Sequence, residues 1–184
     1  MSQDVWTLAA MKINGTILDG VEEQSIPTGI RELIKAADGQ VDPTYAGIME
    51  QDAKMSFRTV HIASFLGLCG IDGLAISANV ILYFQKTSPN GTRVTGANNR
   101  SVTAAAGLVI PRNISASAGQ EAKLSFDVIP ISSDGLTAPL TFASGVTLPT
   151  LSGVTELFTL GPLQINGGTT EEGIQSFEIR VTGP

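Results

Sequence analysis

The sequence contains very little of what catalysis or metal binding usually requires. Its 184 residues include one cysteine, Cys69, and one histidine, His61. A single cysteine excludes an internal disulfide and a cysteine-based metal site. His61 has no serine or cysteine partner close by in the sequence, and no GxSxG, HExxH or P-loop spacing occurs. We therefore expect no catalytic residue, no metal, no cofactor and no enzymatic activity.

Charge is also scarce, and its sign argues against a surface that holds nucleic acid. Charged residues make up 15% of the chain, the formal net charge is −6, and the 11 basic residues are spread singly. A protein that grips phosphates needs clustered lysine and arginine. A surface with so few charges instead favours a chain that is partly covered by other subunits.

Long apolar runs are absent as well. No run approaches the ~20 residues that a membrane-spanning helix needs, and the opening MSQDVW lacks the apolar core of a secretory signal. We therefore expect no membrane association. The length is that of one ordinary domain, and we assign residues 1–184 to a single β domain.

What is present is mostly the pattern of strands and turns, with one exception at Lys54–Gly70. There Met55, Phe57 and Thr59 alternate with polar residues, as in a half-buried strand. Apolar residues then recur with helical spacing, at Ile62, Phe65, Leu66 and Cys69. We expect a short helix that Thr59 caps at its N-terminus and Gly70 ends.

The rest of the chain predicts eight to ten strands. The clearest candidates are Val5–Ile13, Leu74–Gln85, Val102–Ile110, Ala122–Ile131, Glu156–Ile165 and Gln175–Val181. Ser132–Gly153 has the composition of a loop. Ser25–Ala37 favours a long strand or hairpin arm, because Pro27 and Gly29 interrupt a helix, although a helix over Ile30–Ala37 stays open. The fold class is mainly β: a β-sandwich or partly closed barrel with one short flanking helix and a long loop or hairpin arm.

The two ends of the chain resemble each other. MKINGTILDGVEEQSI near the start and LQINGGTTEEGIQSFEI near the end both contain Ile-Asn-Gly before a polar spacer and a strand. Each predicts a hairpin, with turns at Asn14-Gly15 and Asn166-Gly167. Two interpretations stay open: ordinary reuse of hairpin chemistry, or an internal duplication that places two edge hairpins for head-to-tail contact.

The chain resembles the tail tube proteins of tailed bacteriophages. The resemblance lies in the opening strand with Trp6, the link ADGQVDP, the segment MSFRTVHIASFLGLCG at Met55–Gly70 and the late GPLQING. It implies subunits that form homohexameric rings, which stack into a tube whose channel passes DNA without gripping it. The implied partners are other copies of the chain, a tape measure protein and a tail terminator. The implied location is the virion tail, with assembly in the host cytoplasm.

The resemblance also implies a contact between subunits. Lys86–Arg100 is polar and rich in turn residues, which indicates an exposed loop or a long hairpin arm. We expect it to bridge neighbouring subunits through Lys86, Asn90, Gly91, Arg93 and Arg100. The alternatives are another virion component, such as a tail-end or capsid-decoration protein, and a β-sandwich module that binds carbohydrate or another ligand. A binding module predicts an aromatic platform, but Trp6, Tyr45 and Tyr83 are dispersed in the sequence.

Overall fold

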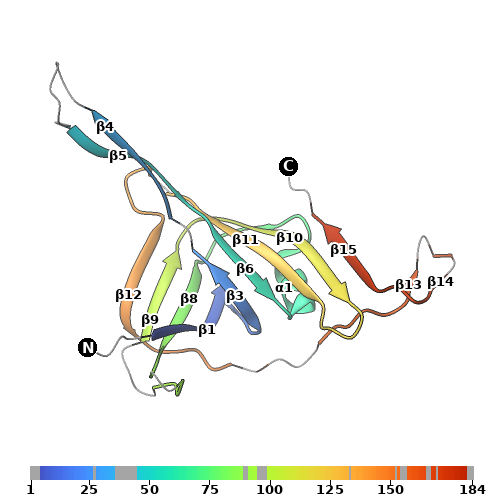
Figure 1. Ribbon diagram of the computed structural model, residues 1–184. Coiled ribbons are helices and arrows are strands. Elements are labelled where there is room, and N and C mark those ends of the chain that lie inside the picture. The colour runs from blue at the N-terminus through green and yellow to red at the C-terminus, as the bar shows by residue number, and fades with distance from the viewer. Residues whose placement is uncertain are drawn as a thin grey trace.

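The computed structural model describes residues 5–26, 28–35, 45–88, 91–94, 99–132, 134–151, 153, 157–164, 167–168 and 170–181. These residues form fifteen strands and one helix (Figure 1). The elements are β1 (Val5–Ile13), β2 (Thr16–Leu18), β3 (Val21–Ser25), β4 (Thr28–Lys35), β5 (Tyr45–Ala53), β6 (Met55–Thr59), α1 (Ile62–Cys69), β7 (Leu74–Ala75), β8 (Val80–Thr87), β9 (Asn99–Ala104), β10 (Gly107–Ser117), β11 (Lys123–Pro130), β12 (Leu140–Val146), β13 (Leu163–Gln164), β14 (Thr170–Glu171) and β15 (Ser176–Arg180).

Two antiparallel sheets pack face to face, so the fold is a β-sandwich and not a closed barrel (Figure 1). The first sheet has the strand order β12-β9-β8-β1-β2. The second has the order β15-β10-β11-β6-β3, with β7 also paired to β10. The prediction of a mainly β fold with one short helix is therefore confirmed.

The core lies between the sheets and follows from the period-two alternation of their strands. The first sheet contributes Met11, Ile13, Val80 and Leu82, all fully buried. The second contributes the residues that alternate in β6 and β11, namely Met55, Phe57, Leu124, Phe126 and Val128. The apolar residues of β6 thus lie inside, as their pattern predicts.

The predicted helix is confirmed, and it lies against the core. Its Phe65 is fully buried, with its ring centroid 4.4 Å from that of Phe126. Gly70 ends the helix, as predicted, with a positive φ of 64°, and its N–H donates to the Leu66 carbonyl. The predicted cap was wrong. His61 occupies the N-cap, and Thr59 is a strand residue whose hydroxyl donates to the Gly20 carbonyl and accepts the His61 N–H.

Two predicted strands are each divided in two. Leu74–Gln85 forms β7 and β8, because Asn79 adopts a positive φ of 68° that ends an extended run. Val102–Ile110 is divided between β9 in the first sheet and β10 in the second. Only its second half pairs with Ala122–Ile131, through β10 and β11.

The prediction for the last third of the chain was only partly correct. Ser132–Gly153 contains the strand β12, although we expected a loop. Of Glu156–Ile165, the described part forms only an isolated bridge at Thr159 and the two-residue β13. The final strand is confirmed as β15, which pairs with β10 at the edge of the second sheet.

A hairpin arm extends from the sandwich (Figure 1). β4 and β5 pair only with each other among the described residues, so the segment from Ser25 onward contains a strand of the expected arm and not a helix. The arm continues two strands of the second sheet without a change of register. Ser25 of β3 pairs with Ser56 of β6, and three residues further out Thr28 pairs with Ala53.

Candidate interaction site

The inner face of the first sheet extends beyond the part that the second sheet covers. Leu140 and Phe142 lie two residues apart on β12 and so point to the same face. Leu140 is 6% exposed, whereas Phe142 is 75% exposed. The second sheet therefore covers the inner face of β12 at Leu140 but not at Phe142. The first sheet is open on its inner face at the Phe142 end.

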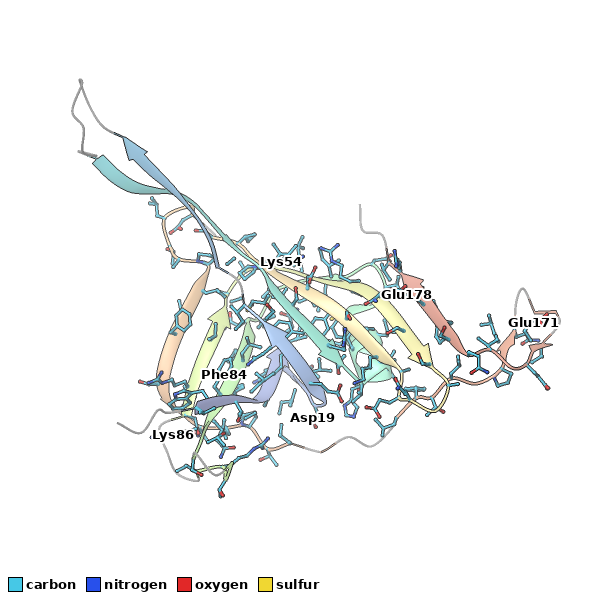
Figure 2. The ribbon with its side chains drawn as sticks, viewed as in Figure 1. Asp19, Lys54, Phe84, Lys86, Glu171 and Glu178 are labelled. Atoms are coloured by element: carbon cyan, nitrogen blue, oxygen red, sulfur yellow. The ribbon has the colours of Figure 1, made fainter. Side chains whose placement is uncertain are left out.

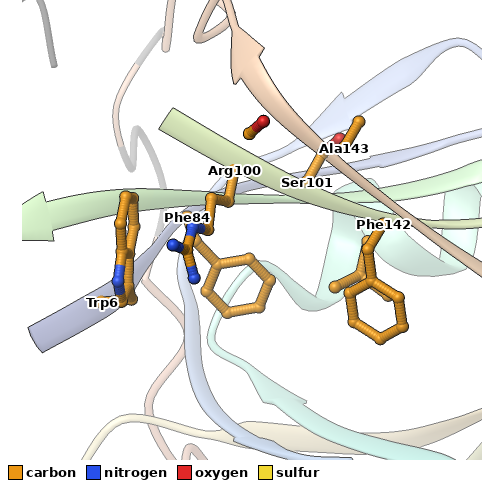
Figure 3. Close-up of a pocket in the computed structure, with 8 residues that line it drawn as sticks. Trp6, Phe84, Arg100, Ser101, Phe142 and Ala143 are labelled. Atoms are coloured by element: carbon orange, nitrogen blue, oxygen red, sulfur yellow. The ribbon is translucent and has the colours of Figure 1, made fainter. Parts of the chain in front are cut away.

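A pocket of about 480 Å³ occupies this open end. Its lining comes from β1, β8, β9 and β12, mainly Trp6, Phe84, Arg100, Val102, Phe142 and Ser144. Figure 3 shows the Phe84 and Phe142 rings pointing to the same side of the sheet. Their register explains this, because Phe84 pairs with Arg100, and Phe142 pairs with Val102. The pocket is the uncovered continuation of the core.

Arg100 supplies the charged group of the pocket. Its guanidinium carbon lies 4.3 Å from the centroid of the Trp6 ring, which is a cation–π contact (Figure 3). A guanidinium has five N–H donors in a planar fork that matches a carboxylate. The arrangement can therefore bind an apolar group and a carboxylate side by side.

The predicted loop residues do not all lie together. Arg93 forms an isolated bridge with Thr87, and Val94 donates its N–H to the Lys86 carbonyl, so this part of the loop folds back along β8. Gly91 is exposed with a φ of 82°. Lys86 pairs with Trp6 across β8 and β1. Asn90 lies outside the described residues.

Of the predicted loop residues, Arg100 is the one in the pocket, and the aromatic residues beside it were not predicted. Phe84 and Phe142 are 58 positions apart in the sequence, so no local pattern joins them to Trp6. Tyr83 lies on the opposite face of β8 from Phe84, because neighbouring strand residues alternate. Tyr45 belongs to the arm. The three aromatic residues considered from the sequence thus do not form one platform.

Asn14 does more than make the turn of the first hairpin. Asn14 and Gly15 join β1 to β2 with positive φ values of 45° and 90°, as predicted. The Asn14 side chain also binds the bend between β7 and β8. Its Nδ2 donates to the Ala75 carbonyl, and its Oδ1 accepts the N–H groups of Ser77 and Ala78. This residue therefore connects two segments that are 61 or more positions apart.

The second predicted hairpin also forms, but in a different setting. β13 pairs with β14, and Gly167 between them has a φ of 66°. Asn166 lies outside the described residues. The first hairpin is part of the first sheet, whereas β13 and β14 form a separate two-stranded sheet that extends from the body of the sandwich (Figures 1 and 2).

The C-terminal segment around this second hairpin exposes many apolar side chains. Its exposed members are Leu151, Leu157, Phe158, Leu163 and Ile179, from 40% to 59% exposed. The segment is tied to the body where Ala122 donates its N–H to the Phe158 carbonyl and where Glu121 bridges Thr159. A run of exposed apolar residues such as this one is typical of an interaction surface.

Asp127 organises the polar side of the second sheet. Its side chain is buried and accepts hydrogen bonds from the Ser56 hydroxyl and Arg112 Nε. Lys54 Nζ lies 3.0 Å from the Asp127 carboxylate (Figure 2). Burial raises the pKa of Asp127, but the hydrogen bonds from Ser56, Lys54 and Arg112 outweigh burial and hold the pKa below its usual range. The carboxylate is thus charged at neutral pH and fully engaged.

Cys69 and His61, whose side chains could be reactive, are both buried. Cys69 is buried in the core, and burial raises the pKa of its thiol to about 11. His61 is buried at the start of α1. Over the described ranges, no three His, Cys, Asp or Glu side chains gather as a metal site would require. Among the described residues, no helix combines the length and the apolarity that a membrane span needs.

Comparison with known proteins gives no relative. No protein-family model matches the chain, and no curated protein and no solved structure matches it at a significant level. The arm, the pocket and the C-terminal segment are the features of the molecule that bear on function.

Proposed function

We propose that the protein is a structural subunit that assembles with copies of itself, as the tail tube subunit of a tailed bacteriophage virion does. The observation that carries this proposal is the β4–β5 arm. Its two strands pair only with each other among the described residues, and it extends from the sandwich (Figure 1). A lone two-stranded hairpin is marginally stable in water, and open strand edges invite pairing with another chain. A neighbouring subunit that covers the arm would stabilise the hairpin and pair its open strand edges.

In this proposal the subunits form stacked rings, taken to be homohexameric, around a channel for DNA. The acidic balance of the chain supports such a channel, because a wall that does not attract phosphate lets DNA slide. The proposed partners are other copies of the chain, with a tape measure protein and a tail terminator at the ends of the tube. The proposed location is the virion tail.

Negative-stain electron microscopy of the purified protein at rising concentration tests the proposal. We expect rings or hollow tubes. The matched variant replaces residues 29–52 with a short turn, which keeps Lys54, the buried Ala53 and the pairing of Thr28 with Ala53. It should remain folded, with an unchanged urea midpoint, and form no tubes. A wild-type protein that stays monomeric at every concentration, or normal tubes from the variant without the arm, would contradict the proposal.

A ligand-binding module is the second candidate, and the pocket at Trp6 and Arg100 is the observation that favours it. Trp6 is the only tryptophan in the chain, so its fluorescence reports directly on this pocket. Titration with neutral and acidic saccharides would change the emission of Trp6 if the pocket binds them. A saturable change in a protein that stays monomeric would favour the binding module over the structural subunit.

A further inference from the structure

We propose that the C-terminal hairpin β13–β14 of one copy docks in the pocket at the open end of the first sheet in the next copy. The inference rests on the proposed function in one respect, namely that copies of the chain associate. It adds the two surfaces that meet: the pocket around Trp6, Phe84, Arg100 and Phe142, and the hairpin with the apolar segment that precedes it.

The two surfaces match in their apolar character. The pocket leaves Phe142 75% exposed on a face that is otherwise core. The hairpin β13–β14 extends from the body and exposes Leu163 by 40%, and the segment before it, which is tied to the body at Phe158, exposes Leu157 by 59%. Burial of such side chains is the main favourable term in association. The shape of the projecting apolar segment is thus complementary to that of the open apolar pocket.

The two surfaces also match in charge. Between Asp72 and Glu121 the only charged residues are basic, and Arg100 in this range lies in the pocket. From Ala138 to the C-terminus the only basic residue is Arg180, against Glu156, Glu171, Glu172 and Glu178. Arg100 thus gives the pocket a positive charge, and Glu171 and Glu172 give the hairpin a negative charge, so the two surfaces attract each other.

The hairpin presents the required pair of groups side by side. Leu163 of β13 pairs directly with Glu171 of β14, and directly opposite residues share one face of a two-stranded sheet. The pocket presents Arg100 beside Phe84 on the same inner face. Docking would place Leu163 against Phe142, the exposed ring of the pocket, and the Glu171 carboxylate at the guanidinium that lies over Trp6.

The positions of the two surfaces define the kind of assembly. Figure 2 shows Phe84 at one end of the molecule and Glu171 at the other. A contact between different surfaces of identical chains is heterologous, and it continues from copy to copy until it closes into a ring or forms a filament. The same contact therefore accounts for growth without any second type of chain.

A charge exchange tests the contact. Arg100→Glu and Glu171→Arg should each weaken self-association by about tenfold or more, because each places like charges opposite one another. The double variant Arg100→Glu/Glu171→Arg should recover association, since the pair is restored with its signs reversed. A mixture of the two single variants should also recover association, because both junctions between unlike variants pair opposite charges, whereas neither variant associates with itself. Sedimentation velocity measures association, and Trp6 emission reports whether the pocket is occupied.

Further variants control for folding and for the identity of the occupant. Phe142→Ser removes a side chain that is 75% exposed, so it should leave the urea midpoint unchanged and still weaken association. Ile71→Ser is the matched control, because it removes another exposed apolar side chain, outside both surfaces, and should leave association unchanged. Loss of association in the pocket variants with normal association of Glu171→Arg would show that another segment fills the pocket, and this would overturn the inference.

Failure of this inference can be told apart from failure of the proposed function. Tubes of normal appearance from both single variants would overturn the docking contact and leave the tube subunit standing. Discrete head-to-tail oligomers without rings or tubes would support the contact and contradict the tube. A double variant that associates no better than the single variants, although it is folded, would also overturn the contact.

Discussion

At the scale of single residues, Asn14 is the side chain whose role the structure changes most. The sequence assigns it to a hairpin turn, whereas the structure adds three hydrogen bonds to the bend between β7 and β8. Glycine can adopt the positive φ of Asn14 but cannot make these bonds. The residue thus has two separable contributions to stability, one from its backbone and one from its amide.

We expect Asn14→Gly to lower the free energy of unfolding by about 1–3 kcal/mol, because it removes three hydrogen bonds that are partly open to water. Asn14→Ala should lower it by about 1 kcal/mol more, since alanine is strained at this φ. Urea denaturation of both variants measures the two terms. If Asn14→Gly is as stable as the wild type, the bonds to the bend contribute nothing.

Asp127 makes the stability of the protein depend on pH in a defined direction. Its pKa is lower in the folded state than in the unfolded state, so its contribution is complete above the unfolded pKa of about 4. The contribution is lost as the pH falls further, through the folded pKa.

We expect Asp127→Asn to be destabilised by about 1–3 kcal/mol at neutral pH, because Arg112 and Lys54 lose a charged partner. The difference between the variant and the wild type should shrink as the pH falls below about 4. Urea denaturation at neutral and at acid pH measures both. A difference that stays constant over this range would show that the charge of Asp127 is not what stabilises the fold.

At the scale of elements, the sequence predicts the helix and β6 correctly because each has one face that is buried in the core. Met55, Phe57, Phe65 and Cys69 lie on strongly apolar faces, and the structure buries all four. β12 was missed for the opposite reason. It is an edge strand whose sequence, LTFASGV, alternates only over Leu140, Thr141 and Phe142 before a run of small residues, which is too short a pattern to recognise.

The pocket could not be predicted from the sequence for a related reason. Trp6, Phe84, Arg100 and Phe142 belong to four different strands, and only the register of the sheet brings them to one face. The register was not evident because β8 begins after Asn79 and β10 begins at Gly107, both with positive φ, at points where the apolar pattern of the sequence is continuous. The positive φ values of these two residues are evident from the structure but not from the sequence.

We expect Phe65→Ala to destabilise the fold by about 3–5 kcal/mol, because Phe65 is fully buried against Phe126. Phe142→Ala is the matched control, and its loss should stay below about 0.5 kcal/mol because the ring is 75% exposed. Denaturant titration at a concentration that keeps the chain monomeric measures both. A loss below about 1 kcal/mol for Phe65→Ala would mean that the helix does not complete the core.

At the scale of the whole molecule, surfaces that are left open lie away from the centre of the sandwich. The arm, the pocket and the C-terminal hairpin are each outside the buried core, and each presents apolar groups or strand edges. A monomer that had to stay soluble would cover such surfaces with charge. This distribution is what the proposed assembly explains as a whole.

The segment between β8 and β9 gives a prediction at this scale. Replacement of residues 88–98 with a short turn should leave a folded subunit that cannot polymerise, since the proposed bridge between subunits includes Gly91 and Arg93. Lys86 and Arg100 remain in this variant, as does the pocket. Circular dichroism checks the fold, and electron microscopy checks for tubes. Tubes of normal length from this variant would show that residues 88–98 do not contribute to the contact between subunits.

The register that continues across the junction from β3–β6 to the base of β4–β5 has a consequence for how the chain can change during evolution. A residue inserted in one strand of the arm alone would turn every later side chain to the other face of the ribbon unless a bulge absorbed it, as the register shift between Arg31 and Glu32 does for one extra residue in β5. Residues gained together in β4 and β5 would lengthen the arm by about 3.4 Å for each pair and leave the sandwich untouched. The reach of the arm can therefore diverge between lineages in small steps while the core stays the same.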